Sequence, residues 1–452
     1  MPSIILDKTQ FLKGISSGGY QTDGLFRQTF TKGVDVFRSR ATYGLLQQGY
    51  GQTNLTGSVV LDSIKWFVQK TDDYYGYGVD GYLYKFTGAS LTASELNSAG
   101  KASRLGARGL AIYNDGTADK LFYFSNTTIG TYDFASTYNN AVHSGLQSAP
   151  HSAKQFQGVL YFGNGRYVGS VNATTLNLTA LTLPIGFEVQ DIEIYANYLA
   201  ILAFKPTGTL NTECKLYLWD TFSSATAWNF EYDVPEKAYS LEKYKNDIAI
   251  FGYNVRLFNS GGFDIIHEIE GTTVYPGQTS YNKNFLYWQE YGILMSYGSP
   301  NAYIAPSKQA PLTNIGEKGA IINLYSESTQ FLISNNGNFA LLYNTGYSGG
   351  QAHTVKVELP VPSKIKGITL VFEKLATNDG ISFNLKDDQA TLLSSKTITY
   401  AADGAITQKK FITTSKISNY FYLEFTWSSY ETGNLTIKKI IVDYDPTELT
   451  TA

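Results

Sequence analysis

Short apolar runs recur along nearly the whole chain, and turn-forming residues separate them. The runs are rich in Val, Ile, Tyr, Phe and Thr, whereas Gly, Asn, Asp and Ser lie between them. No long segment has the i, i+3, i+4, i+7 apolar spacing of an amphipathic helix, and the best helix candidate is the single turn near Ala93–Leu96. The pattern therefore predicts an all-β protein.

The middle of the chain, residues 57–351, repeats one plan of a strand, a tight turn, an aromatic-apolar strand and a third strand. The aromatic-apolar runs, which we interpret as second strands, are Gly81–Phe86, Lys120–Phe124, Gly158–Gly163, Cys214–Trp219, Asn246–Gly252, Asn284–Trp288 and Gln330–Ser334. Their starts lie about 42 residues apart on average, which is typical of four-stranded propeller blades. Hairpin turns are indicated at Val79–Gly81, Asn114–Gly116, Gly163–Gly165 and Asn335–Gly337. We predict a β-propeller of about seven blades.

Two flanking regions differ from this repeat. Residues 1–56 are rich in glycine and alternate weakly, which predicts an extended N-terminal arm that packs on its own propeller or on a neighbouring subunit. Residues 352–452 alternate cleanly, as in Thr354–Leu359 and Tyr420–Phe425, and predict a C-terminal jelly-roll-like β-sandwich. The stretch Pro360–Pro362 is interpreted as a stiff linker.

Composition narrows the class of protein. Of the 452 residues, 43% are hydrophobic, which argues against disorder, and only 16% are charged, against about 25% in typical domains. The net charge of −3 predicts no general attraction to nucleic acid. The longest apolar run, Tyr198–Phe204, is too short for a membrane span, and the first residues lack a signal-peptide pattern, so we expect a chain made in a cytoplasm. Cys214 is the only cysteine, so neither a disulfide framework nor a cysteine metal cluster is expected, and no cofactor is predicted.

Paired carboxylates are the main enzymatic option. Asp191 and Glu193 alternate along one strand and so share a face, as acids near a propeller channel would in a glycosidase. Asp220 follows Trp219, and Glu290 lies close after Trp288, so either tryptophan could stack on a sugar ring beside an acid. The alternative is that these acids are ordinary solvated strand positions. No nucleophile or nucleotide motif is present, so no catalytic residue is predicted.

Other candidate sites have equally plain alternatives. The four histidines lack metal-ligand spacing, and surface or core positions explain them. Paired acids in loops can hold calcium but are also common turn residues, and clustered aromatics can bind sugar but also fill cores. The basic pair Arg38 and Arg40 is too thin for a nucleic-acid groove. The residues concerned are His143, His151, His267 and His353; Asp379–Gly380 and Asp387–Asp388; and Trp427 with Tyr420, Tyr422 and Tyr430.

The complete layout resembles the propeller-containing structural proteins of tailed bacteriophages, such as nozzle, tail-tube-associated or baseplate components. The resemblance rests on the nearly cysteine-free chain without a signal, the glycine-rich arm Phe11–Gly24, the Tyr- and Phe-rich degenerate blades and the terminal module ending at Leu435–Asp445. It implies assembly in the host cytoplasm, a place in the virion and no catalysis. No functional residue carries over, because no family motif can be matched.

The expected function is therefore that of a virion structural component, in the tail or attached to it, with other virion proteins and copies of itself as partners. Recognition of a host-surface glycan is a secondary role. The alternative is a carbohydrate-binding or glycan-cleaving propeller with an appended carbohydrate-binding module, which predicts loss of activity on substitution of Asp191 or Glu193. A third interpretation is a bacterial surface or scaffolding propeller. Fold alone does not decide among them.

Overall fold

The computed structural model of the chain places its residues in two units. The described residues are 2–7, 28–32, 34–35, 47–48, 50–54, 64–87, 91–96, 106–205, 213–259, 261–269, 273–281, 285–290, 293–297, 306–311, 318–324, 330–335, 338–346, 351–354, 356–377, 379–387, 389–413, 417–427 and 436–446. One unit consists of Thr53–Gly292 and Thr313–Leu341, and the other of Met1–Gln52, Ile293–Leu312 and Leu342–Ala452. Within the described ranges the only helix is α2 (Tyr400–Asp403), so the all-β prediction is confirmed.

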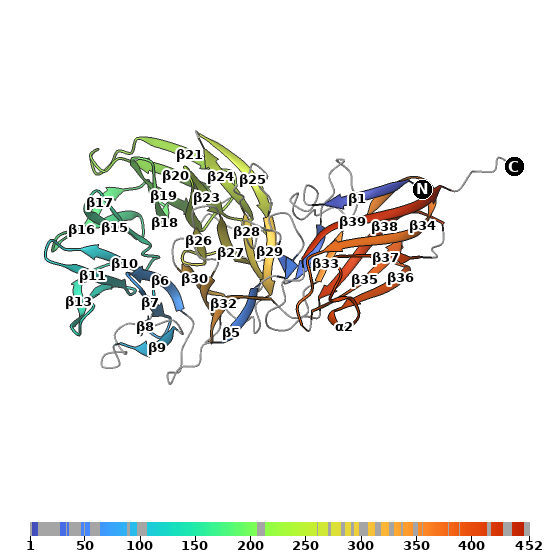
Figure 1. Ribbon diagram of the computed structural model, residues 1–452. Coiled ribbons are helices and arrows are strands. Elements are labelled where there is room, and N and C mark those ends of the chain that lie inside the picture. The colour runs from blue at the N-terminus through green and yellow to red at the C-terminus, as the bar shows by residue number, and fades with distance from the viewer. Residues whose placement is uncertain are drawn as a thin grey trace. The chain divides into compact units, whose positions relative to one another are not determined.

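Seven four-stranded sheets account for most strands of the described chain (Figure 1). The first three sheets are β6 (Ile64–Lys70), β7 (Asp73–Gly78), β8 (Leu83–Thr87), β9 (Thr92–Glu95); β10 (Gly109–Asn114), β11 (Asp119–Phe124), β12 (Thr128–Tyr132), β13 (Tyr138–Ser144); and β14 (Ala153–Phe156), β15 (Val159–Asn164), β16 (Tyr167–Asn172), β17 (Thr175–Thr182). The next two are β18 (Glu188–Tyr195), β19 (Tyr198–Lys205), β20 (Glu213–Trp219), β21 (Phe230–Val234); and β22 (Ser240–Tyr244), β23 (Asp247–Phe251), β24 (Asn254–Asn259), β25 (Gly262–Glu268). The last two are β26 (Thr279–Tyr281), β27 (Leu286–Glu290), β28 (Ile293–Tyr297), β29 (Pro306–Pro311); and β30 (Lys318–Leu324), β31 (Gln330–Asn335), β32 (Asn338–Gly346), β5 (Tyr50–Asn54). A further short pair joins β3 (Val34–Asp35) to β4 (Gln47–Gln48).

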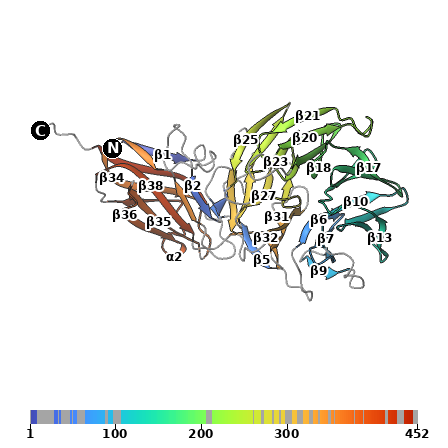
Figure 2. The same ribbon diagram turned by 180° about the vertical axis from the view of Figure 1, so that it is seen from behind.

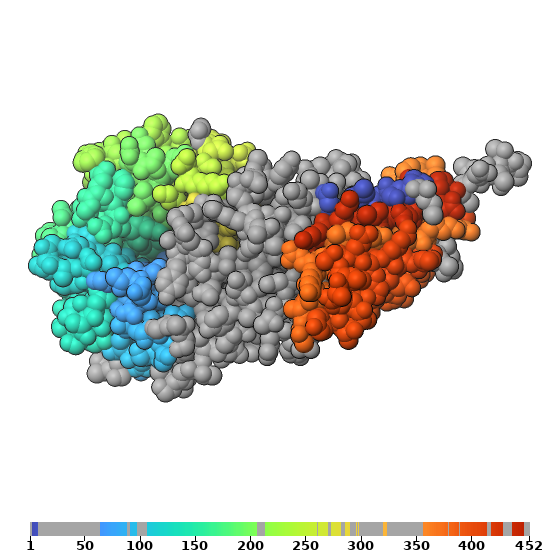
Figure 3. All heavy atoms as spheres, viewed as in Figure 1, coloured from blue at the N-terminus to red at the C-terminus, as the bar shows by residue number. Residues whose placement is uncertain are grey.

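The first strands of these sheets form a ring. Contacts run from β6 to β10, β14, β18, β22, β26 and β30 and return to β6. Figures 1 and 2 show the sheets fanning outward from these strands, and Figure 3 shows the described outer surface of the earlier sheets in blue to green. This radial arrangement is a β-propeller, as the repeat predicted.

Buried side chains fill the space between consecutive sheets. One cluster joins Tyr77 of β7 to Tyr123 of β11, with ring centroids 5.7 Å apart, and another joins Phe124 to Phe162 of β15, at 5.2 Å. A third and a fourth cluster continue the series between β14–β17 and β18–β20, and between β18–β20 and β22–β24. The aromatic residues of the repeat therefore stabilise the stacking of neighbouring sheets, because each sheet buries its faces against the next.

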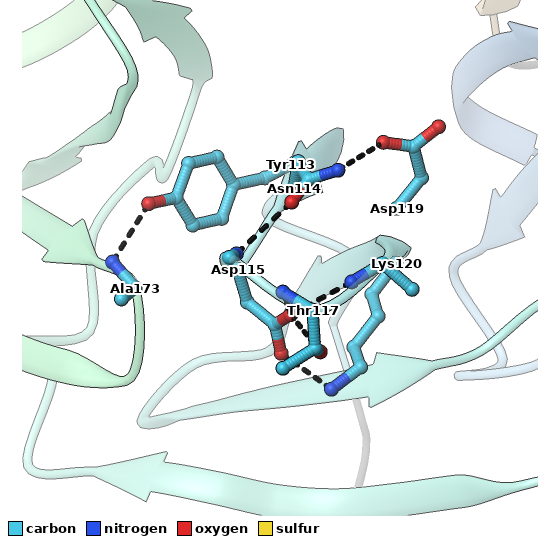
Figure 4. Close-up of polar contacts among 9 residues, drawn as sticks. Tyr113, Asn114, Asp115, Thr117, Asp119, Lys120 and Ala173 are labelled. Carbon is cyan, nitrogen blue, oxygen red and sulfur yellow. Dashed lines mark hydrogen bonds and ion pairs between the residues drawn. The ribbon is translucent and has the colours of Figure 1, made fainter.

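The predicted hairpin turns position the strands. The turn after Asn114 joins β10 to β11, and its Asp115 side chain accepts bonds from Thr117 and Lys120 (Figure 4). Burial raises the pKa of Asp115, but these donors outweigh burial and hold it well below its usual value. The hydroxyl of Tyr113 accepts a bond of 2.8 Å from the amide of Ala173, which lies in the next sheet between β16 and β17. Turns also form after Gly78 and Asn164, whereas residues 336–337 lie outside the described part.

Three local predictions need correction. Gly81–Phe86 and Cys214–Trp219 belong to third strands, β8 and β20; the second strands are β7 and β19, so second strands start 39 to 49 residues apart. Ala93–Leu96 is not a helix, because β9 pairs with β8 and buries Ala93, whereas one helical turn lacks enough hydrogen bonds to compete. Pro360–Pro362 lies inside a strand rather than in a linker, and pairing is irregular there because proline donates no ladder bond.

The second unit contains a β-sandwich-like sheet assembly of nine strands. Its main path runs β1 (Ser3–Asp7), β39 (Ile437–Pro446), β34 (Val357–Phe372), β38 (Ile417–Trp427), β33 (Gln351–Thr354) and β2 (Gln28–Lys32). Three strands branch from that path: β35 (Gly380–Asp387), β36 (Leu392–Thr399) and β37 (Gln408–Ile412). Alternate residues of β34, β38 and β39 are buried, including Ile368, Phe421 and Val442, which explains the alternation seen in the sequence.

Strands from the N-terminal region, residues 1–56, complete sheets formed by distant parts of the chain. β1 pairs with β39 from Ser3–Asp443 to Asp7–Lys439, and β2 pairs with β33. β5 is the fourth strand of the sheet that contains β30, β31 and β32. These segments therefore pack by strand addition to the same chain.

Candidate functional site

A cavity of about 260 Å³ lies in the centre of the propeller ring. Its walls come from the first strand of every four-stranded sheet, which gives it the position of a propeller channel. The charged lining residues are Lys154 of β14, Asp191 of β18 and Glu242 of β22. The remaining lining residues are Trp66, Phe67, Val68, Leu110, Ala111, Ile112, Ser152, Ala153, Gln155, Leu241, Gly277, Thr279 and Ile321.

Asp191 is fixed by four hydrogen bonds from three strands or their flanking residues. One oxygen accepts bonds from the hydroxyl of Ser152 and from the amide of Ile192, the latter at 2.8 Å. The other accepts bonds from the Ser240 hydroxyl at 3.1 Å and the Leu241 amide at 2.7 Å. Burial raises the pKa of Asp191 to about 6, because these donors and Lys154 compensate only partly for the loss of water.

A β-bulge in β18 directly precedes Asp191. The pairing of β18 with β19 shifts between Val189 and Asp191, so Gln190 is the extra residue of β18. Asp191 is 3% exposed and Glu193 is 5% exposed, two residues further along the same strand. Both acids therefore lie on one face, as the alternation predicted, but that face is internal.

Lys154 provides the positive charge of the cavity. Its Nζ lies 2.6 Å from Oε2 of Glu193, while Oε2 of Glu242 accepts a bond of 2.7 Å from Thr279. Burial lowers the pKa of Lys154, but the charges of Glu193, Glu242 and Asp191 outweigh it and the net shift is upward. Burial raises the pKa of Glu242, more than Lys154 lowers it. The Lys154 side chain nevertheless remains 38% exposed, and it lines the cavity.

These contacts form a polar belt, by which we mean Ser152, Lys154, Asp191, Glu193, Ser240, Glu242 and Thr279. The belt connects β14 or its flank to β18, β18 to β22, and β22 to β26. Its carboxylates accept bonds from the protein's own donors, so the belt links neighbouring first strands to one another. The pKa values of two of its acids, Asp191 and Glu242, are raised.

The tryptophan–acid pairs do not form open stacking platforms. Trp219 and Trp288 are at most 2% exposed. Asp220 accepts bonds from the amides of Phe222 and Ser223 and so closes a turn. The side chain of Glu290 lies outside the described residues.

The other candidate residues are scattered. His151 is buried, with Nδ1 2.6 Å from the carbonyl oxygen of Gly163, and burial lowers its pKa. His143 is half-buried on β13, and His267 lies on β25 with its ring 5.6 Å from that of Trp288. The side chain of His353 on β33 is outside the described residues.

In the sandwich-like unit, the candidate acids and aromatics have structural contacts. Asp379 accepts a bond from the Ala376 amide, and Asp387 accepts bonds from the amides of Gln389 and Thr391. No cluster of three metal-binding side chains occurs among the described residues. Trp427 is fully buried, and Tyr420 and Tyr422 are half-buried on β38. Arg38, Arg40, Asp388 and Tyr430 lie outside the described part.

Sequence reasoning missed the partners of Asp191 and Glu193. A signal was present: three successive first strands, or the residue before them, carry two polar residues separated by one apolar residue. These pairs are Ser152 with Lys154, Asp191 with Glu193, and Ser240 with Glu242. An alignment of the repeats on their first strands, rather than on their second strands, would have placed these three pairs at equivalent positions.

Comparison with known proteins supports the fold alone. No protein-family model matches the chain, and no curated protein matches it. Among solved structures, the RRP9 WD40 repeats are similar at 10% identity and a TM-score of 0.50, over 66% of this chain and 99% of that one. The Pan2 WD40 domain of Neurospora crassa is similar at 9% identity and a TM-score of 0.47, over 65% and 96%. Among the helices of the described residues, none has the length and apolarity needed to cross a bilayer.

Proposed function

We propose that this protein is a structural component of a tailed-bacteriophage virion, in the tail or attached to it, assembled in the host cytoplasm. It would act through subunit interfaces with other virion proteins and copies of itself, without catalysis. The observation that carries the proposal is strand addition by the N-terminal region. β1 and β2 lie at the two ends of the main path of the nine-stranded sheet, while β5 completes a propeller sheet. A segment that pairs by strand addition is suited to pairing with a neighbouring copy during assembly.

The polar belt favours this proposal over a glycan-cleaving enzyme. A glycosidase needs one carboxyl group to protonate the leaving oxygen and another to act on the sugar. In this chain Asp191 accepts four internal bonds and Glu193 is paired with Lys154. Host-surface glycan recognition stays a secondary role within the proposal.

We further infer seven blades and a jelly-roll-like sandwich. Seven first strands in a closed cycle of contacts support the blade number. The sandwich type is supported by the long strand β34, which changes partners along its length. It pairs with β38 from Val357 to Lys364 and with β37 from Gly367 to Val371, while β39 pairs with it from Ser363 to Phe372.

The first test is the light-scattering mass of the purified full chain, with negative-stain images of the same fraction. We expect rings, tubes or defined multimers of the 49.9 kDa chain. A variant lacking residues 1–7 removes β1 and should lose assembly while keeping the propeller. A matched control, Ile185→Asp, changes a side chain that is 81% exposed in the propeller unit and should still assemble.

A strictly monomeric full chain would contradict self-assembly. A second measurement addresses the virion directly: mass spectrometry of purified phage particles produced by a host that carries the gene among portal, capsid and tail genes. Absence of the chain from such particles would refute the proposed location.

A further inference from the structure

A second cavity, of about 370 Å³, adjoins the central cavity through the shared residue Trp66. Its lining residues lie at or just before the starts of β6, β10, β14 and β26, together with Val79 from the turn after β7. This places it at one mouth of the channel. Its size falls within the range of cavities that hold small ligands. Neither cavity is used by the proposed assembly function.

One wall of this mouth is a preformed turn, Tyr275–Gln278. The side-chain oxygen of Gln278 accepts a bond of 2.9 Å from the Tyr275 amide, and the Gln278 amide donates to the Tyr275 carbonyl at 3.0 Å. Gly277 has φ +85°, and a Cβ there would lie 2.3 Å from the carbonyl oxygen of Lys65. Its own carbonyl accepts a bond from Ile321. The turn is therefore held in place, while residue Tyr275 remains 51% exposed with its ring against that of Tyr239, at 5.3 Å between centroids.

Arg108 gives the mouth a positively charged group. Its backbone is fixed, because its amide donates to Phe124 and its carbonyl accepts from His151. Its Nε donates to Oδ1 of Asn126 at 2.8 Å, which holds the guanidinium plane. The two terminal nitrogens have no hydrogen-bond partner within the described residues. The guanidinium is thus oriented and half-buried with its planar fork available.

Charge and shape together select a class of ligand. The charged residues that line the mouth are Lys65 and Arg108, both cationic, and its acidic neighbours Asp191 and Glu242 line only the central cavity. Trp66 and Tyr275 offer ring surface, and Pro150, Pro276 and Val79 are apolar. An oriented guanidinium beside aromatic rings matches a planar carboxylate joined to an apolar group better than a bare inorganic anion.

We propose that the channel mouth binds a carboxylate carried on an aromatic or large aliphatic group. The carboxylate would accept two bonds from the terminal nitrogens of Arg108, and the apolar group would lie between Trp66 and Tyr275. Such a group can come from a free organic acid or from the carboxyl end of a peptide, because both present the same atoms.

The test is calorimetric titration of the full chain with three probes: phenylacetate, N-acetyl-glycyl-phenylalanine and the C-terminal amide of that dipeptide. We expect the acid dipeptide to bind at least about tenfold more tightly than its amide, since a charge-assisted bidentate contact is lost. Tight binding of phenylacetate indicates a free acid as the source, and preference for the dipeptide indicates a chain end; both support the site.

Matched variants separate the site from general effects. Arg108→Gln should weaken binding of the acid dipeptide about tenfold and leave binding of its amide unchanged. Arg166→Gln is its control, because Arg166 also donates a bond through Nε, in its case to the Leu183 carbonyl oxygen, but lines neither cavity. Tyr275→Ser, at an exposed position, should weaken binding of both dipeptides. Tyr253→Ser changes a residue that is 67% exposed elsewhere in the propeller and should leave binding of both unchanged. Equal affinity for acid and amide, an unchanged Arg108→Gln variant of native fold, or no binding at millimolar probe would overturn the proposal.

Discussion

Replacement of Asp191 tests whether the polar belt stabilises the propeller. Asp191→Ala leaves three buried groups of other strands without their acceptor: the Ser152 and Ser240 hydroxyls and the Leu241 amide. Each such group costs about 1–3 kcal/mol. Removal of the carboxylate also relieves a burial penalty of about 3 kcal/mol at neutral pH, estimated from the rise in its pKa. Three such groups at about 2 kcal/mol each, less this relief, give an expected net loss of about 3 kcal/mol in the free energy of unfolding.

The pH dependence gives a sharper test. The pKa of Asp191 is raised from its ordinary 3.8 to about 6 in the folded chain. Folded protein thus binds this proton more readily than unfolded protein, and stability rises as the pH falls through 6 towards 4. Between pH 7.5 and 4.5 the gain from this group is about 2 kcal/mol. His143 and His151 act in the opposite sense, because burial lowers their pKa values.

Asp191→Asn isolates the carboxyl group from those histidines. The asparagine is similar in shape but does not titrate, and its amide nitrogen must face the N–H of either Ile192 or Leu241. The assay is urea unfolding followed by tryptophan fluorescence, for wild type and variant at both pH values. The stability difference between them should grow by about 2 kcal/mol on acidification. A constant or shrinking difference, or an Asp191→Ala variant as stable as wild type, would refute the reasoning.

Two further substitutions test how the sheets are held. Gly169→Ala should destabilise the chain by about 2 kcal/mol or more, because its Cβ would lie 2.3 Å from the Phe162 ring; Gly262→Ala, with no atom nearer than 3.8 Å, is the control, and equal melting temperatures would contradict this. Tyr113→Phe removes the hydroxyl that accepts from the Ala173 amide and should cost about 1–2 kcal/mol in urea unfolding, against no change if the two sheets do not depend on that bond.

The repeating strands could be predicted because their signals are local. Alternation and turn residues such as those after Asn114 act over a few neighbours, and the turn forms where they indicated it. The order of strands within one sheet has a weaker local signal, because β7 and β8 are both aromatic and both buried. The second strand β7 contains two glycines, and Gly76 lies against Ile64 and Phe67. The place of β7 in the sheet therefore depends on how neighbouring strands pack against it rather than on its own hydrophobicity.

The candidate site could be predicted only in part. The sequence places Asp191 and Glu193 on one face, but their donors in other sheets come from residues 39 to 50 positions away. Such contacts depend on the relative register of consecutive sheets and on the bulge at Gln190, and neither is encoded in a short window. The mouth cavity was missed for the same reason, because Trp66, Arg108 and Tyr275 come from three separate loops or strand starts.

The two cavities differ in a way that bears on function. In the central cavity, the carboxylates of Asp191 and Glu193 accept bonds from groups of the same chain, so a ligand there would have to displace contacts worth several kcal/mol. At the mouth, Arg108 is oriented by one nitrogen and offers two others, so a ligand would add contacts without breaking any of its described ones. A ligand binds more tightly where the site is already organised and its donors have no other acceptor. Any ligand of this propeller should therefore be sought first at the mouth, with the belt serving to hold β14 and β26, two of the strands whose starts line it.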